Sequence, residues 1–259
     1  MATLTVAGLH AAPYGPPLLR DIGFQLESGE VLGLIGPNGA GKSSLVHCIA
    51  GGLPVTRGSI RFAGRELAQW QSTERARAVA VQTQYSSLNF PFSVEEVVLL
   101  GRIPHASGRA ADLAILEEVL EATDTASLRC RRYTQLSGGE RQRVQLARTV
   151  AQVWRSEDAP ARLLLLDEPS AALDPAHQRM VLEVVARVAA DGCSVIIASH
   201  DFNLLASRVD RMLVMREGGQ FAFGPPEAVL TRAVFEEVFE IPVLVLPHPV
   251  SGRPMVVRS

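Results

Sequence analysis

The chain has 259 residues, 47% of them hydrophobic, which is enough to bury a sizeable core as one large α/β domain or two smaller lobes. Its formal charge of −2 and pI near 6.3 show no basic surplus, which argues against nucleic acid as a main partner. No apolar run approaches the roughly 18–20 residues of a membrane span, and the first residues do not read as a signal peptide. We therefore expect a cytoplasmic protein, any membrane role of which depends on a partner.

Three cysteines, Cys48, Cys130 and Cys193, show neither paired nor metal-ligand spacing. This usage is typical of a protein from a reducing compartment. We expect each cysteine to be a small buried residue rather than a reactive thiol.

Two short strands are expected near the start of the chain, at residues 4–6 and 22–26, where apolar and polar side chains alternate. Between them, residues 12–17 are rich in proline and glycine and predict a loop. The aromatic residue of this loop, Tyr14, can stack on an adenine base or simply pack locally. The sequence alone favours neither interpretation.

A glycine-rich loop follows the apolar strand expected at residues 31–35. It fits the phosphate-loop pattern and reads Gly36-Pro37-Asn38-Gly39-Ala40-Gly41-Lys42-Ser43. The glycines allow a tight turn with inward N–H groups, and a helix expected from Lys42 points its positive dipole end at the same anion. Lys42 would reach the β- and γ-phosphates, Ser43 would offer its hydroxyl to Mg²⁺, and Ser44 continues the site.

Lys42 is the only lysine of the chain, because all other members of the 25 basic residues are arginines. A compact ammonium suits a phosphate in a narrow loop, whereas a planar guanidinium would not fit. The alternative is an ordinary glycine-rich turn between a strand and a helix.

The next elements expected are a helix at residues 44–50 and short strands at 59–63 and 79–81. The last strand delivers Gln82 and Gln84 to a loop. A glutamine carbonyl near a nucleotide can bind Mg²⁺ or orient water, although a solvated loop glutamine is commoner.

The pattern then becomes helical. Ser93 and Glu96 form a capping box, and Gly101 is expected to end the helix that they begin. Residues 110–123 carry apolar side chains at helical spacing. We expect a helical insert over about residues 88–155, with a protein partner on its exposed face.

The segment Leu136-Ser137-Gly138-Gly139-Glu140-Arg141-Gln142 follows. Ser137 and Glu140 form a second capping box, and the helix that they open has an apolar face of Val144, Ala147, Val150, Ala151 and Trp154. A helix N-terminus with glycines and a hydroxyl is also an anion site. A second phosphate can therefore be held by Ser137, Gly138, Gly139 and Glu140.

Four leucines at residues 163–166 end in Asp167 and Glu168, as expected of a central parallel strand at its carboxyl end. Two adjacent acids there are costly unless a cation meets them. Mg²⁺ would supply that charge for Asp167, leaving Glu168 to orient and deprotonate the attacking water. The alternative is that the two acids form an exposed acidic turn. Further along the chain, Asp174 is expected to start a helix.

A buried strand at residues 194–198 ends just before His200, which could hydrogen-bond a γ-phosphate. A lone histidine is usually structural, so this assignment depends on its position. Residues 211–215 and 220–223 predict a closing hairpin, and the tail, residues 225–259, predicts a helix and short strands.

The motifs occur in this order: the phosphate loop, Gln84, the segment from Leu136 to Gln142, Asp167-Glu168, Ala171-Ala172-Leu173-Asp174 and His200. In this order the chain resembles the nucleotide-binding subunit of ATP-binding cassette (ABC) transporters over essentially its full length. The resemblance implies an α/β P-loop NTPase core with a mostly parallel sheet, an antiparallel β subdomain and an α-helical subdomain. It also implies a single ABC ATPase domain over residues 1–259, with a short extension from about residue 225.

The resemblance further implies a homodimer with two ATP molecules between its copies. Lys42 and Asp167 of one copy and Ser137 and Gly139 of the other would bind each ATP. Tyr14 matches the adenine-stacking aromatic, and Gln84 rather than Gln82 matches the family's glutamine. Catalysis would then involve Glu168, His200, Gln84 and Lys42, and the Mg²⁺ ligands would be Ser43, Gln84 and Asp167.

Residues 86–98, 151–154 and 174–178 resemble ATPases of bacterial importers for iron-siderophores, cobalamin and especially haem. This implies two integral-membrane permease subunits, a periplasmic binding protein and a place at the cytoplasmic face of the inner membrane. Ala171 stands where the family commonly has serine, so a hydrogen bond from that hydroxyl is missing or replaced. Alternatives are a ferric-siderophore or cobalamin importer, or a non-transport cassette of iron–sulfur assembly.

Overall fold

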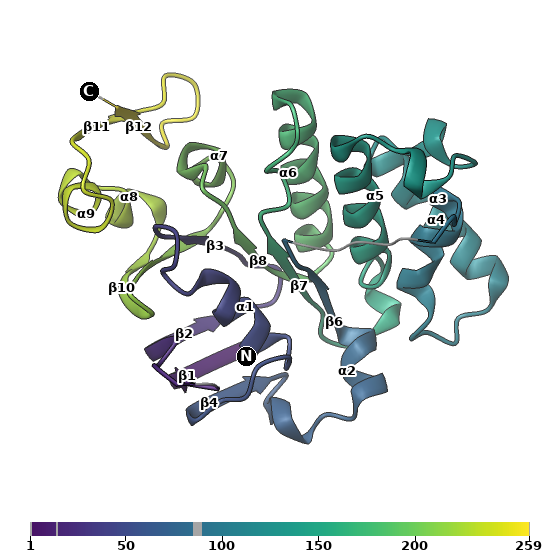
Figure 1. Ribbon diagram of the computed structural model, residues 1–259, viewed down its shortest axis with the longest axis horizontal. Coiled ribbons are helices and arrows are strands. Elements are labelled where there is room, and N and C mark those ends of the chain that lie inside the picture. The colour runs from purple at the N-terminus through teal and green to yellow at the C-terminus, as the bar shows by residue number, and fades with distance from the viewer. Residues whose placement is uncertain (1, 14, 85–89, 259) are drawn as a thin grey trace. The chain divides into compact units, whose positions relative to one another are not determined.

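The computed structural model describes residues 2–13, 15–84 and 90–258. The chain divides into two compact units, of which unit 1 comprises Met1–Gln69 with Ile196–Ser259, and unit 2 comprises Trp70–Val195. Both units combine strands and helices, which confirms the α/β fold class (Figure 1). No helix within the described ranges is long and apolar enough to cross a membrane.

The antiparallel part of unit 1 is built on β1 (Leu4–Ala11). It pairs with β2 (Leu19–Leu26) on one side and with β4 (Arg57–Phe62) on the other, and β5 (Arg65–Glu66) follows β4. Every second side chain at the start of β1 is buried, as the alternating pattern predicts. The expected strands are therefore confirmed, and the first two are longer than predicted.

The strand that leads into the glycine-rich loop is β3 (Val31–Ile35), which is buried along its whole length. It pairs in parallel with β9 (Arg211–Arg216), and α1 (Lys42–Ile49) follows the loop. β9 turns back antiparallel into β10 (Gly219–Gly224), which confirms the predicted hairpin. A buried parallel strand thus delivers the loop at its carboxyl end.

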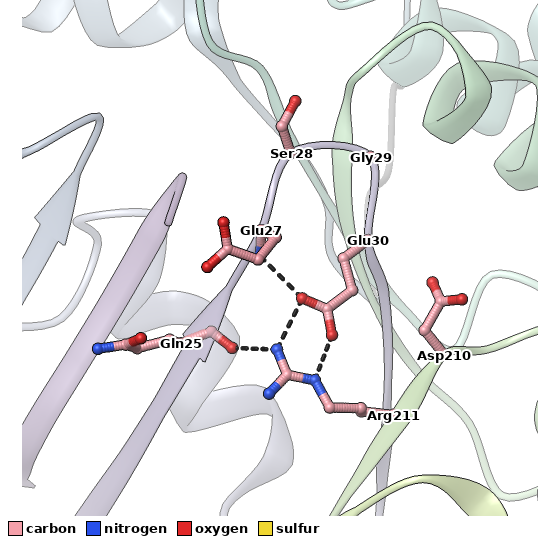
Figure 2. A pocket seen from close by; sticks show the side chains of 7 residues that line it. All are labelled: Gln25, Glu27, Ser28, Gly29, Glu30, Asp210 and Arg211. Atoms are coloured by element: carbon pink, nitrogen blue, oxygen red, sulfur yellow. Dashed lines mark hydrogen bonds and ion pairs between the residues drawn. The ribbon is translucent and has the colours of Figure 1, made fainter. Parts of the chain in front are cut away.

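Polar contacts hold the amino end of β3 (Figure 2). The Arg211 guanidinium pairs with the Glu30 carboxylate, donates to the Gln25 carbonyl at 2.6 Å, and lies 4.8 Å from the Phe223 ring centroid. The N–H of Val31 donates to the carboxylate of Asp210 at 2.8 Å. Gln25, Glu30, Asp210 and Arg211 line a polar hollow at the end of β3 away from the glycine-rich loop. Their hydrogen bonds position the start of the strand.

The rest of unit 1 lies in the C-terminal part of the chain. Its elements are α7 (Phe202–Ala206), α8 (Pro226–Val229), α9 (Arg232–Val238), β11 (Val243–Pro247) and β12 (Pro254–Arg258). The amide of Asn203 exchanges two hydrogen bonds with the backbone of Val256, at 2.9 and 2.7 Å. These bonds tie the β11–β12 hairpin to α7. The tail has two helices rather than the one expected.

Unit 2 contains two parallel strands, β6 (Val79–Gln82) and β7 (Leu163–Asp167), and β8 (Ser194–Ala198) runs across the boundary of the units. Its α-helices are α2 (Ser72–Ala78), α3 (Val94–Leu99), α4 (Arg109–Ala122), α5 (Gly138–Ala151) and α6 (Pro175–Ala190). The short 3₁₀ turns of the chain are Leu67–Gln69 in unit 1, and Leu100–Arg102, Ala126–Leu128, Tyr133–Gln135 and Ser156–Asp158 in unit 2. The apolar face expected on α5 is buried, but Trp154 lies beyond the end of that helix.

A buried ion-pair cluster joins the helical segments of unit 2. Arg102, 3% exposed, donates to both carboxylate oxygens of Asp158 at 2.8 Å and to Asp112 at 3.0 Å. Burial alone would raise the pKa of Asp158, but the hydrogen bonds and charge of Arg102 outweigh it and lower that pKa. Removing either partner would leave an uncompensated buried charge, so the cluster fixes these segments together.

Two predictions about single residues are wrong. Cys48 and Cys193 are buried, which raises their thiol pKa to about 11 and about 12, but Cys130 is exposed. Gly101 does not end its helix, because a 3₁₀ turn continues through Arg102. Gly101 instead allows close packing, since a Cβ there would lie 2.1 Å from the carbonyl oxygen of Arg148 in α5.

Replacing Gly101 with alanine is therefore expected to destabilise the protein. The added methyl must push α5 away, and overpacking of this kind costs about 1–3 kcal/mol. Urea unfolding measures the effect, with Gly52→Ala as the control, because a Cβ at Gly52 meets its nearest neighbour at an ordinary 3.6 Å. Equal midpoints for the two variants would contradict the close approach.

Candidate functional site

The glycine-rich loop of unit 1 needs its glycines for both conformation and space. Gly36, Gly39 and Gly41 have φ angles of 154°, 78° and 98°. A Cβ on Gly36 would lie 2.3 Å from the carbonyl oxygen of Met215. The loop therefore follows a path in which residues with side chains would be strained.

Lys42 begins α1 and lies folded against this loop. Its side chain is largely buried, and Nζ donates to the carbonyl oxygens of Gly36 at 2.7 Å and Pro37 at 3.1 Å. No side chain within the described ranges caps α1, and the side chain of the next residue, Ser43, is exposed. A helix N-terminus, an ammonium and a hydroxyl thus meet at one place, which suits a polyphosphate.

His200 lies in the same unit as the loop. It follows β8 and is exposed, and the N–H of Ser199 donates to the carbonyl oxygen of Leu34 at 3.3 Å. Leu34 lies two residues before Gly36. Unit 1 therefore brings the chain at His200 next to the strand end from which the loop departs.

Unit 2 brings together residues that leave its parallel strands. Gln82 of β6 lies opposite Leu166 of β7, so the carboxyl ends of the two strands meet at one edge. Asp167 is the last residue of β7, and Gln84 lies two residues beyond the end of β6. Asp167 and Glu168 are 2% and 6% exposed, whereas Gln84 is exposed. This burial excludes the alternative of an exposed acidic turn.

Glu168 has an uncommon backbone conformation. Its φ is 53°, in the left-handed region, which costs a residue other than glycine about 1–2 kcal/mol. The side chain amide of Gln142 in α5 donates to the Glu168 carbonyl oxygen at 3.0 Å. The sequence patterns gave no role to Gln142 beyond its place in the motif, because contacts across the fold leave no local signal.

The predicted capping box at Ser137 is confirmed. The Ser137 hydroxyl accepts from the Glu140 N–H at 3.3 Å, and the Glu140 carboxylate accepts from the Ser137 N–H at 2.7 Å. The bond from the Ser137 backbone lowers the pKa of Glu140, whose carboxylate also pairs with Arg131 at 2.8 Å. The Glu140 side chain thus serves the cap, and Ser137 and Gly138 remain exposed at the helix start.

Among the predicted residues, Tyr14 lies outside the described residues. The oxygen donors proposed for a metal are the Ser43 hydroxyl, the Gln84 carbonyl and the Asp167 carboxylate. Hard oxygen ligands of this kind fit Mg²⁺, which uses one or two carboxylates together with water and substrate phosphates. Within the described ranges, histidine, cysteine and acidic side chains form no group of three or more that could hold a metal by itself.

Comparison with known proteins identifies relatives across nearly the whole chain. The family model described as ABC transporter matches residues 19–171. The hemin import ATP-binding protein HmuV of Pseudomonas entomophila is 49% identical over 254 residues, which cover 98% of this chain and 99% of that protein. Proteins of the same name from Myxococcus xanthus and Gloeobacter violaceus are 47% and 44% identical, over 92% and 98% of this chain and 90% and 93% of their own lengths.

Solved structures agree with these relatives. A metal-chelate type ABC transporter in an inward-facing conformation matches with a TM-score of 0.80 and 26% identity, over 100% of this chain and 97% of that chain. An ATP-binding cassette in its ADP conformation matches with a TM-score of 0.77 and 22% identity, over 93% of this chain and 98% of that chain, which shows a shared fold.

Proposed function

Because this chain belongs to the ABC transporter family, we propose that it is the ATP-hydrolysing subunit that energises haem import through a membrane permease. The observation that supports haem as the cargo is near full-length identity of 44–49% to proteins named for hemin import. The enzyme is an ATPase of the ABC importer type, and such a subunit acts with a permease in the membrane.

We assign the nucleotide phosphates to the loop from Gly36 to Ser43, with Ser44 beside it. Lys42 supplies the positive charge, since its ammonium already lies against the loop carbonyls. Ser43, Gln84 and Asp167 are the proposed ligands of Mg²⁺. When bound, the ion would neutralise charge that develops on the β- and γ-phosphates.

Glu168 is the proposed general base. A carboxylate that is 6% exposed is largely shielded from bulk water, and it can take a proton from the attacking water. His200 is proposed to hydrogen-bond the γ-phosphate, for which its exposed position after β8 is suited. Tyr14 is proposed to stack on adenine.

The working form is proposed to be a homodimer with ATP between the copies. Ser137, Gly138 and Gly139, with Glu140 fixing their cap, would meet the phosphates bound by the other copy. Two permease subunits, a periplasmic binding protein and a place at the cytoplasmic face of the inner membrane complete the proposal. Residues 1–259 would act as one ABC ATPase domain, with the helical subdomain at about 88–155 and the extension from about 225.

Haem delivered by the cognate periplasmic binding protein is expected to raise the ATPase rate of the assembled complex several-fold, because cargo binding favours the state that hydrolyses ATP. The measurement uses the chain reconstituted with its permease in proteoliposomes. A ferric siderophore and cobalamin, offered in the same way, should leave the basal rate unchanged.

A complex that carries Glu168→Gln controls for contaminating ATPases. Stimulation by cobalamin or a siderophore instead of haem would reassign the cargo. Stable association with soluble proteins alone, and with no permease, would favour a non-transport cassette.

A further inference from the structure

One side chain of α5 holds the backbone of Glu168. Nε2 of Gln142, in the second turn of that helix, donates to the Glu168 carbonyl oxygen at 3.0 Å, across 26 positions of sequence. A carbonyl oxygen only accepts hydrogen bonds, so the amide must present its NH₂ group there. Both residues belong to unit 2, so the bond lies within one compact unit.

This bond acts on a conformation that needs support. Glu168 has a φ of 53°, and residues other than glycine persist there only when their surroundings hold them. The same carbonyl oxygen also accepts from the N–H of Ala171, at a longer 3.4 Å. The direction in which the Glu168 side chain leaves the end of β7 therefore depends on the Gln142 amide.

A second contact joins the start of α5 to the same segment. A Cβ on Gly139 would lie 3.3 Å from the carbonyl oxygen of Ala172 and 3.7 Å from Cδ2 of Leu173. Gly139 and Gln142 are three residues apart and so share one face of the helix. The first turns of α5 and the chain after β7 are thus packed together at two points.

We propose that Gln142 is a positioning residue for ATP hydrolysis, which keeps Glu168 in the conformation that places its carboxylate against the attacking water. This inference rests on the proposed role of Glu168 as general base. Without the amide, Glu168 is still present, but its backbone can leave the left-handed conformation. A smaller fraction of the molecules can then hydrolyse ATP at any moment. Loss of the Gln142 amide should therefore lower kcat and leave the KM for ATP unchanged, since Gln142 makes no proposed contact with nucleotide.

Gln142→Met removes the donor and keeps the length of the side chain. We expect kcat to fall about tenfold, which corresponds to the free energy of about one hydrogen bond, and KM to change less than about twofold. Gln142→Glu is a second test, because a carboxylate of the same shape cannot donate, and the same loss is expected. Both variants should fold, since residue 142 is only partly buried.

Gln145→Met is the matched control. Gln145 lies three residues further along the same helix, but its amide donates at 2.7 Å to the hydroxyl of Tyr133, which is not part of the segment that carries Glu168. This variant should unfold at lower temperature, because the lost bond is buried, and should keep kcat within about twofold of the parent.

The inference is overturned if both Gln142 variants keep the parental kcat. It is also overturned if Gln145→Met lowers kcat by as much as the Gln142 variants do. It is also overturned if the Gln142 variants change KM alone. ATP affinity in a Glu168→Gln background gives a readout without turnover, and it should not change when Gln142→Met is added. Failure of the proposed function looks different, because Glu168→Gln by itself would then hydrolyse ATP normally.

Discussion

Replacing Glu168 with glutamine is expected to lower ATP turnover by about a thousandfold or more while ATP binding is retained. The amide has the shape of the carboxylate but cannot accept the proton of the attacking water, and general-base catalysis typically contributes about 10²–10⁴-fold. Because Glu168 is 6% exposed at the end of a buried strand, bulk solvent cannot readily replace it. Steady-state hydrolysis and equilibrium nucleotide binding measure the two effects separately.

Glu240→Gln is the control for this experiment. Glu240 shares the left-handed backbone, with a φ of 57°, but its side chain is exposed in the C-terminal part of unit 1. This variant should hydrolyse ATP at the parental rate. Normal turnover by Glu168→Gln would remove Glu168 from its assigned role, and a loss of ATP binding would make the residue part of the binding site instead.

Replacing Lys42 with alanine is expected to weaken ATP binding by about a hundredfold or more. The ammonium is the cation proposed for the β- and γ-phosphates, and charge-assisted hydrogen bonds of this kind are about twice as strong as neutral ones. The substitution also removes the donor that serves the carbonyl oxygens of Gly36 and Pro37, at 2.7 and 3.1 Å. The first effect weakens the attraction for the phosphates, and the second disfavours the loop conformation that receives them.

The composition of the chain allows a direct test of the role of Lys42 in ATP binding. Since Lys42 is the only lysine, an amine-reactive reagent has one side-chain target in the whole chain. Labelling at Lys42 should slow when Mg²⁺ and ATP are added, and it should be absent from Lys42→Ala. Lys42→Arg tests whether charge alone suffices, and it is expected to bind weakly, because the planar guanidinium does not match the space of an ammonium. Retention of tight binding by Lys42→Ala would refute the assignment.

Much of the site could be predicted because its determinants are local. The phosphate loop depends on glycines and a lysine at fixed spacing, and the capping box at Ser137 closes within four residues. The buried strands at residues 31–35 and 163–166 can be recognised in the sequence as continuous apolar runs. Each of these patterns is complete within a short segment, so no other part of the chain was needed to recognise it.

Residues whose role depends on a distant partner were missed or misassigned. Gly101 was expected to end a helix, but it is small because the backbone of α5 at Arg148 approaches it. Cys130 was expected to be buried with the other two cysteines, but it lies in the turn between the 3₁₀ segments Ala126–Leu128 and Tyr133–Gln135 and is exposed. A single sequence has no period or spacing that reports such contacts.

The glycine-rich loop, the two acids at the end of β7 and the order of the motifs were determined by the sequence itself, since each pattern encodes a local geometry and its chemistry. Only the tertiary structure decided that Glu168 adopts a left-handed backbone and that Gln142 holds its carbonyl oxygen. The physical reason is that a hydrogen bond between residues 26 positions apart exists only after the start of α5 has packed against the segment that follows β7 in unit 2.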